Sequence, residues 1–462
     1  MYEGRLLKCG RIAGDTDNVI VEAPIDQRVR AAPRSATPDE GAVAERPWRD
    51  WLVGHLRRRT WALVAMAVFT AVSLAFSFLW GPVVRHQAIW VIPGDIWSTY
   101  RDAHLVGWGN IGGIYDPYLG LLTFPAVVVV LAPVAMVSWH FHLTESFGQI
   151  TVAHPSAWLW LGPAILLLGA SCLVALDAMA EELGIGRGKR ILLLGVESVI
   201  VFQVVTIWGH PEDMVAIGLA TYALLMGSRR RWTATGWLWG AAIAFQPLVL
   251  VLFPLGFATT RRGERVRLCV RSALPTVVLL AAPLITQWGM TTRSMLHQSN
   301  RVDLNHPTPW IAFSSHLGPN VVSAGPGRVI ALLAAVAIGG VAWRLHPSLA
   351  AMVWMGAVAL SLRCFFESVM DPFYLGPPFA LILVACAVRP GWRRLVTGTV
   401  VMVVATVLAF HHLGEWATWL PMVALLSVGL SCGWPGRDAF GPTIPSDTVA
   451  DQIAVRKEPV SA

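Results

Sequence analysis

The chain has 462 residues, of which 55% are hydrophobic and 14% are charged, and its formal net charge is +7. Soluble domains carry about 25% charged residues, so this composition excludes an ordinary soluble globular fold. The apolar residues form continuous runs rather than alternating with polar ones, which excludes a transmembrane β-barrel. The sequence therefore predicts an all-α, polytopic helical membrane protein. The positive charge needs no nucleic-acid partner, because arginine in short loops is the usual topology signal of such proteins.

The two ends of the chain differ in composition from its middle. Residues 1–60 are polar and rich in Ala, Pro, Asp and Arg, and we expect a mostly disordered cytoplasmic tail. The first apolar run begins only near Trp61, so no signal peptide is expected. Residues 433–462 form a second expected disordered tail, which leaves 61–432 as the transmembrane domain. The six cysteines form no CxxC pair, so neither a disulfide nor a metal site is expected.

Long apolar stretches recur between the tails. A helix needs roughly 20 apolar residues to cross the bilayer core, and by this measure the sequence predicts about 10–12 transmembrane helices. Two stretches, 121–138 and 233–257, are ambiguous and are predicted to be short or re-entrant. The main predicted spans are 61–81, 157–179, 190–208, 213–227, 268–289, 327–344, 348–364, 374–388, 395–412 and 416–432.

Arginine clusters give the expected orientation, because basic residues favour the cytoplasmic side. Strict alternation through every stretch would place 187–190 and 229–231 outside. If 121–138 and 233–257 make no net crossing, every basic cluster falls inside, and both termini are cytoplasmic. Breaks that suit such re-entrant helices occur at Pro125, Pro133, Gln246-Pro247 and Pro254. The outer side then holds loop 82–120, WGHPED (208–213), loop 290–326, FFESVMDPFY (365–374) and HHLGEW (411–416).

The first outer loop contains DIWSTYRDAHLV, residues 95–106, which predicts a short amphipathic helix. Asp95 and Asp102 are two helical turns apart and are expected to share a face. Trp90, Trp97 and Trp108 suit an aromatic belt, so we expect the helix to lie in the membrane interface.

The segments GDIWSTYRDA and IGGIYDP, together with GHPEDMVAIGLATYALL and the helix containing Gln246-Pro247, resemble the GT-C superfamily of integral-membrane glycosyltransferases. The likeness is greatest to the branch of α-mannosyltransferases that use polyprenyl-phosphate mannose. It covers about residues 61–430 and is strongest over 93–117 and 208–255. The resemblance implies a GT-C-like fold in the plasma membrane and a role in cell envelope biosynthesis. It also implies transfer of a sugar from a polyprenyl phosphate to a glycolipid or polysaccharide acceptor on the extracytoplasmic side, without a metal or other cofactor.

Asp95 matches the position of the family's catalytic Asp, and the resemblance implies that it is the general base of an inverting displacement. A carboxylate near the acceptor hydroxyl can take its proton as the new bond forms. The structural alternative is that Asp95 caps the following helix. Asp102 is a reserve catalytic candidate; the plainer alternative is that it is a solvated neighbour of Arg101. Tyr100 and Arg101 of the same helix are candidate substrate-binding residues.

His210, Glu212 and Asp213 are expected to bind sugar hydroxyls or to hold Asp95 in place. The alternative is that they form the cap and negative first turn of the next helix, which the helix dipole favours. The HxED spacing is not an established metal-ligand pattern, and hard ions such as Mg²⁺ prefer oxygen ligands.

Two further outer segments contain candidate residues. Arg293, His297, Arg301 and His306 of the long loop are candidate ligands for the anionic leaving phosphate, or are solvated loop residues. The HPTPW turn of this loop departs from the family pattern. Glu367 and Asp371 flank the outer end of a span, where burying an ionisable group is costly. Glu367 is a reserve catalytic candidate and Asp371 a substrate-binding candidate, unless Asp371-Pro372 simply forms an interfacial turn.

Two other classes of function remain open at this point. A transporter or lipid flippase would also place polar groups along broken helices, but the chain shows no convincing internal repeat. A non-catalytic membrane scaffold leaves the acidic outer loops without a role.

Overall fold

The computed structural model describes residues 48–86, 89–115, 124–143, 153–296, 299–302, 306–323, 327–411 and 413–441. The chain divides into two units, Met1–Leu52 and Val53–Ala462. Only the beginning of one helix is described in the first unit, so the expected tail over residues 1–47 lies outside the described residues. Residues 442–462 of the second expected tail also lie outside them.

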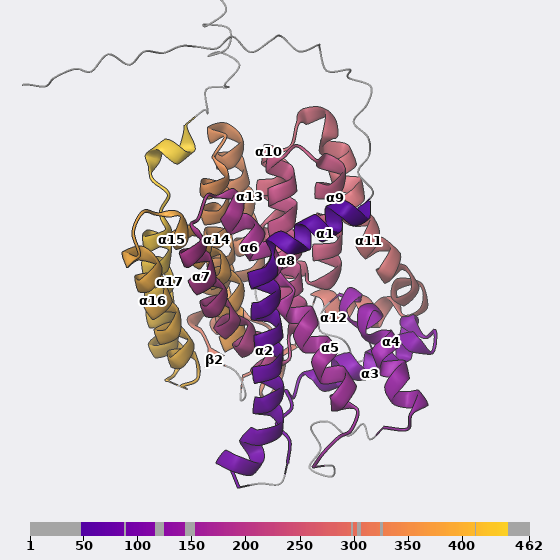
Figure 1. The fold of residues 1–462 in the computed structure, drawn as a ribbon. Coiled ribbons are helices and arrows are strands. Elements are labelled where there is room, and N and C mark those ends of the chain that lie inside the picture. Colours follow the sequence, from indigo (N-terminus) through magenta and orange to yellow (C-terminus); the bar gives the residue numbers. More distant parts are fainter. Residues whose placement is uncertain are drawn as a thin grey trace, which may run out of the picture. The chain divides into compact units, whose positions relative to one another are not determined.

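The second unit is built almost entirely of helices (Figure 1). The α-helices are α1 (Trp48–Arg58), α2 (Thr60–Leu79), α3 (Ile96–Gly107), α4 (Ala126–His140), α5 (Trp158–Ala170), α6 (Cys172–Glu182), α7 (Arg187–Val201), α8 (Pro211–Ser228), α9 (Trp232–Phe245), α10 (Phe253–Thr259), α11 (Arg265–Thr286), α12 (Trp288–Leu296), α13 (Gly327–Leu345), α14 (Leu349–Phe366), α15 (Gly376–Val388), α16 (Arg393–Ala409) and α17 (Glu415–Gly433). Short 3₁₀ or π segments are η1 (Trp80–Val84), η2 (Ile111–Gly113), η3 (Phe202–Trp208), η4 (Pro247–Val251), η5 (Arg262–Glu264), η6 (Pro309–Phe313), η7 (Pro372–Leu375) and η8 (Arg437–Phe440).

The strands are short and lie in or beside the long loop before α13. Antiparallel pairing joins β1 (Ser299–Arg301), β4 (Val321–Ser323) and β3 (His316–Gly318) in that order. A second pair joins β2 (His306–Pro307) to β5 (Val369–Met370), with His306 opposite Met370. This pairing attaches the HPTPW turn to the segment that contains Glu367 and Asp371.

Seven helical segments within the described residues are long and apolar enough to cross a membrane. The predicted class, an all-α polytopic helical membrane protein, is therefore confirmed. Three of the ten main predicted spans, 213–227, 374–388 and 395–412, are not among these segments: α8 begins with a polar Pro-Glu-Asp turn, and α15 and α16 have only 13 and 17 residues. The seven segments are Thr60–Val84, Trp158–Glu182, Arg187–Trp208, Arg262–Thr286, Gly327–Leu345, Leu349–Phe366 and Glu415–Gly433.

The predicted break in the stretch 233–257 is present, and this stretch makes no net crossing. Gln246 is extended and Pro247 follows it, which ends α9, because proline cannot donate to the helix and disfavours helical backbone in the residue before it. The chain then folds back, so that a Cβ at Gly256 of α10 would meet the ring of Trp239 in α9. The hairpin thus returns toward its starting end.

The contacts of α9 with α11 agree with this hairpin. Gly236 packs against Arg271, and Gly240 packs against Pro275, so residue numbers rise together along the two helices. Helices α9 and α11 are therefore parallel, which requires the segment between them to return. Glycine at both positions permits the close approach, because a Cβ at Gly240 would lie 2.6 Å from the carbonyl oxygen of Arg271.

The stretch 121–138 contains a helix that folds back on the one before it. Its described part forms α4, which packs antiparallel on α3: Gly107 lies against Met136, and His104 lies against Trp139. The segments before α3 and after α4 meet through a hydrogen bond of 2.9 Å from the backbone N–H of Trp90 to the carbonyl of Ala153. Trp90 and Ala153, which flank α3 and α4 in the chain, thus lie next to each other.

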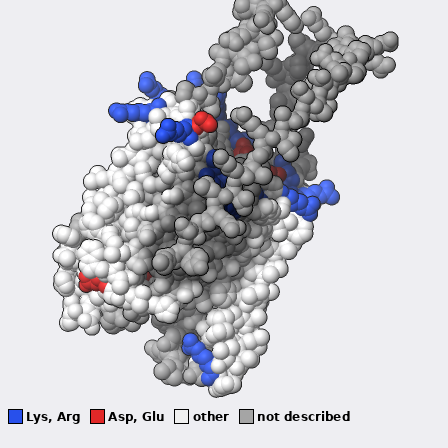
Figure 2. Space-filling view, turned by 90° about the vertical axis from the view of Figure 1, so that its left-hand side faces the viewer, with Lys and Arg blue, Asp and Glu red and all other residues white. Residues whose placement is uncertain are grey.

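The basic clusters gather at one end of the bundle, here named the basic end. Arg59 and Arg190 both bind Asp177, at 2.9 and 2.8 Å. Arg229 pairs with Glu182, and Lys189 donates to the carbonyl oxygen of Arg389. Most of the Lys and Arg side chains on the face drawn in Figure 2 lie toward its upper end. Helices α7 and α14 start near this end, so the segments after them lie at the opposite end, here named the polar end.

Candidate functional site

A left-handed glycine brings the WGHPED segment against the start of α3. Gly209 ends η3 with φ +87°, a conformation that glycine adopts without steric cost. A Cβ at this position would lie 2.9 Å from Pro93 Cβ and 3.2 Å from the backbone nitrogen of Ile96. Only a residue without a side chain permits this approach, which places His210 beside Asp95.

His210 links two carboxylates at the polar end. Its Nε2 lies 3.1 Å from Asp95 Oδ2, and its Nδ1 lies 2.9 Å from Glu212 Oε1. The imidazole also stacks on Phe373, with 4.0 Å between the ring centroids. The Asp95 side chain is 57% exposed, whereas that of Glu212 is 4% exposed. The cluster therefore has one carboxylate open to solvent and one buried, with histidine between them.

The two carboxylates favour a protonated His210. Burial alone lowers the pKa of His210, but the hydrogen bonds to Asp95 and Glu212 and the charges of Glu212 and Asp213 outweigh burial. The pKa of His210 is consequently raised well above its ordinary value. A doubly protonated imidazole donates from both nitrogens, so it can bind both carboxylates at once.

Asp95 does not act as a side-chain cap of α3. It occupies the N-cap position, but its carboxylate accepts no hydrogen bond from the helix backbone. Only its carbonyl oxygen takes part, accepting a hydrogen bond of 3.1 Å from Ser98 Oγ. The alternative capping role is thus absent, and the carboxylate is directed to His210 instead.

Glu212 and Asp213 lie in the first turn of α8, after Pro211, as the dipole argument predicts. Asp213 is buried and accepts a hydrogen bond from the side-chain amide of Gln246, at the break between α9 and η4. The broken helix predicted from Gln246-Pro247 therefore reaches the site, and its amide holds the second acid of WGHPED.

Asp371 lies close enough to respond to the charges of this cluster. It is 4% exposed, and within the described part of the chain its Oδ1 has no hydrogen-bond partner. Burial raises the pKa of Asp371 to about 7; the charge of His210 lowers it, and that of Asp95 raises it. Asp371 is therefore a buried carboxyl that is coupled electrostatically to Asp95 and His210.

Asp102, Arg101 and Tyr100 have different surroundings from Asp95. Asp102 is fully buried rather than solvated, and Arg101 binds its Oδ1 at 2.7 Å. Tyr100 is also buried, with its ring 4.6 Å from that of His104. Burial, and then the charge of Asp102, raises the pKa of Tyr115. Asp102 thus lies on the buried face of α3, whereas the Asp95 side chain is open to solvent.

Glu367 belongs to a buried ion-pair group at the outer end of α14. It is 1% exposed, binds Arg328 Nε at 2.9 Å, and lies 3.7 Å from Arg363 Nε. Its carbonyl accepts a hydrogen bond of 2.6 Å from Thr308 of the HPTPW turn. These contacts join α13, α14 and the long loop, and they leave Glu367 with two cations rather than open to an acceptor.

The remaining candidates of the long loop are only partly described. Arg293 is exposed on α12, and His306 is buried in β2. The backbone of Arg301 pairs with Val321 in the sheet, but its side chain is not described. His297 lies outside the described residues.

Two contacts at the site are absent from the sequence-based predictions. The stacking of Phe373 on His210 joins segments far apart in the chain, and the only local signal is an aromatic residue after Asp371-Pro372. The hydrogen bond from Gln246 to Asp213 has a clearer signal, because a polar residue before proline inside an apolar stretch already marks a broken helix.

The fold and this geometry define a polytopic helical membrane protein with an acid–histidine–acid cluster, Asp95–His210–Glu212, at its polar end. Within the described residues, no group of three or more His, Cys, Asp or Glu side chains is placed to hold a metal ion. No protein-family model and no curated protein matches this chain.

Proposed function

We propose that the protein is a membrane glycosyltransferase that moves a sugar from a polyprenyl-phosphate donor to an acceptor hydroxyl, with Asp95 as general base. One observation carries the proposal: the Asp95 carboxylate is exposed, does not cap α3, and is held by His210. A carboxylate that is oriented yet open to solvent can meet an acceptor hydroxyl. The resemblance of residues 93–117 and 208–255 to the GT-C superfamily points to the same residue.

The proposed reaction is a single displacement. Asp95 takes the proton of the acceptor hydroxyl, whose oxygen forms a bond to the anomeric carbon. The bond from that carbon to the phosphate oxygen breaks, and the polyprenyl phosphate leaves with one more negative charge. Asp95 loses one negative charge in the same step, so the total charge is unchanged. The displacement inverts the anomeric configuration.

His210 has a positioning role in this proposal. Its hydrogen bond fixes one oxygen of Asp95, and Glu212 fixes the imidazole from the other side. Acid–base sites commonly contain such a third group, here Glu212, which orients the residue that holds the reacting side chain. Asp371, beside this pair, is proposed to accept a hydrogen bond from a sugar or acceptor hydroxyl. Arg101 and Arg293 are proposed contacts for the leaving phosphate, because arginine binds phosphate oxygens well.

The substrate and location belong to the same proposal. Mannose is the proposed sugar, with arabinofuranose as the alternative, and a glycolipid or polysaccharide is the proposed acceptor. The polar end faces the extracytoplasmic side of the plasma membrane, because the basic end contains the arginine clusters that favour the cytoplasm.

A transporter is the second candidate, and the broken helix favours it. The α9–α10 hairpin places Gln246 against Asp213, and transporters commonly build substrate sites from such interrupted helices. Membranes from cells that express the protein separate the two functions. They would be given radiolabelled polyprenyl-phosphate mannose or arabinofuranose with a lipid extract. The proposal predicts labelled product; release of unchanged donor to the opposite leaflet without product would favour the transporter.

A further inference from the structure

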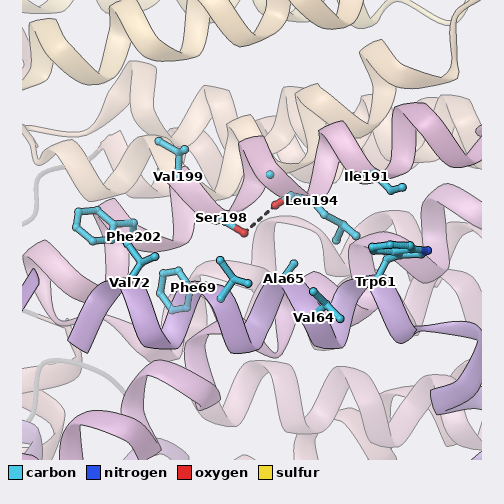
Figure 3. Close-up of a pocket in the computed structure, with 12 residues that line it drawn as sticks. Trp61, Val64, Ala65, Phe69, Val72, Ile191, Leu194, Ser198, Val199 and Phe202 are labelled. Atoms are coloured by element: carbon cyan, nitrogen blue, oxygen red, sulfur yellow. Dashed lines mark hydrogen bonds between the residues drawn. The ribbon is translucent and has the colours of Figure 1, made fainter. Parts of the chain in front are cut away.

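An apolar groove runs between α2 and α7, and its volume is about 570 Å³. Its walls extend from Trp61 to Val72 on α2 and from Ile191 to Phe202 on α7 and η3 (Figure 3). A helix rises 1.5 Å per residue, so each wall is roughly 16 Å long. Val68 and Val72 are more than half exposed on its α2 wall, so the groove opens to the surroundings of the helices.

The α7 wall leaves open space in the groove, and the hydroxyl group on this wall is already hydrogen-bonded. Gly195 contributes to the α7 wall, and a Cβ at this position would meet no atom within 4 Å. Ser198 contributes a hydroxyl, but that hydroxyl donates to the carbonyl oxygen of Leu194 at 2.8 Å. Figure 3 shows this hydrogen bond lying along α7. The groove thus fits a flexible hydrocarbon chain.

One end of the groove has an available positive charge. The guanidinium of Arg187 lies 5.2 Å from the centre of the Trp61 ring. Neighbouring cations are engaged elsewhere: Arg190 binds Asp177, and Lys189 donates to the carbonyl oxygens of Ala387 and Arg389. Among the residues that the structure describes, no carboxylate pairs with Arg187.

The backbone adds to this charge. Arg187 is the first residue of α7, and no side chain caps the helix at Gly186. The first N–H groups of a helix have no partner within it, and they favour an anion at this end. A second hollow of about 380 Å³ lies beside the same turn and is lined by Arg187, Lys189 and Arg389. An apolar groove therefore ends where an anion is favoured.

We propose that an anionic glycerophospholipid of the bilayer occupies this groove, with an acyl chain between α2 and α7 and its phosphate at Arg187 and the start of α7. A zwitterionic lipid offers the same chain but no net negative charge for Arg187. The site lies toward the basic end, away from the Asp95–His210–Glu212 cluster, and it is independent of the proposed transfer reaction.

Two pairs of variants test the site. Gly195→Phe fills the groove, and Gly340→Phe is its control, because a Cβ at Gly340 on α13 also meets no atom within 4 Å. Arg187→Gln removes the charge, and Arg58→Gln is its control, since Arg58 is exposed and its Nε hydrogen-bonds to the Gly54 carbonyl. Native mass spectrometry would count phosphatidylglycerol and phosphatidylcholine retained by the full-length protein.

The proposal predicts that Gly195→Phe abolishes one tightly retained phosphatidylglycerol and that Gly340→Phe does not. Arg187→Gln is expected to weaken its retention about fivefold, the effect of about 1 kcal/mol per basic residue near an anionic lipid. Equal retention by all variants would overturn the proposal, as would an equal loss of both lipids, which indicates unspecific lipid around the helices. Recovery of a polyprenyl phosphate that only Gly195→Phe removes would assign the groove to a different occupant and also overturn it.

Discussion

Replacing His210 with alanine tests the cluster at the polar end most sharply. The substitution removes the hydrogen bonds to Asp95 and Glu212 and leaves the Glu212 carboxylate, 4% exposed, without its cation. Removing one partner of a buried ion pair costs about 3–5 kcal/mol. The Asp95 side is more than half exposed and adds only about 0–1 kcal/mol. His210→Ala is therefore expected to reduce the free energy of unfolding by about 3–5 kcal/mol.

The double variant His210→Ala/Glu212→Gln separates this charge effect from lost packing on Phe373. Glutamine removes the uncompensated charge, so the double variant is expected to be more stable than His210→Ala alone. Thermal and denaturant unfolding in the same lipid nanodiscs would measure both. The buried ion pair between His210 and Glu212 does not stabilise the fold as argued if His210→Ala reduces the free energy of unfolding by less than about 1 kcal/mol. The same follows if the double variant is no more stable than the single one.

The remaining predictions concern stability. Because burial raises the pKa of Asp371 to about 7, the native state holds a proton that the unfolded chain loses, so stability is expected to fall as pH rises from about 4 to 7. His210, with its raised pKa, contributes stability that is complete below about 6.5 and is lost as pH rises through its folded-state pKa. Measuring the free energy of unfolding from pH 5 to 9 checks both effects. Asp371→Asn should remove the decrease in stability that ends near pH 7. Glu367→Ala removes the carboxylate that Arg328 and Arg363 share and should cost about 3–5 kcal/mol; a loss no larger than that of Glu415→Ala would contradict it. Glu197→Met should stabilise the protein by about 1–3 kcal/mol, because neither buried carboxylate oxygen of Glu197 has a partner among the described residues; unchanged or reduced thermal stability would refute this.

Much of the architecture follows from local sequence signals. Helix length and hydropathy predicted the class, and the Gln246-Pro247 pair predicted the hairpin that makes no net crossing, because proline acts on its own backbone whatever surrounds it. The contact between the WGHPED segment and Asp95 was also expected. Gly209 explains it, since its left-handed backbone and missing Cβ permit the approach of Ile96.

Other features depend on partners far away in the chain, and no local pattern contains them. Glu367 is enclosed by Arg328 of α13, and Asp102 is buried although an isolated amphipathic helix suggested a solvated side chain. Helix α1 also begins within the expected disordered tail, where His55 reaches Tyr222 of α8 at 2.9 Å. Burial and pairing of these groups arise from tertiary packing, which periodicity along one helix does not specify.

The proposed role of Asp95 as the base of a sugar-transfer reaction can be tested by replacing its carboxylate. Asp95→Asn keeps the shape of the side chain and removes its basicity, while Asp438→Asn makes the same change at an exposed site at the basic end. Both would be assayed at matched expression with radiolabelled polyprenyl-phosphate mannose and a lipid extract. Labelled product is expected from wild type and Asp438→Asn and none from Asp95→Asn. Equal product from Asp95→Asn and wild type would contradict it.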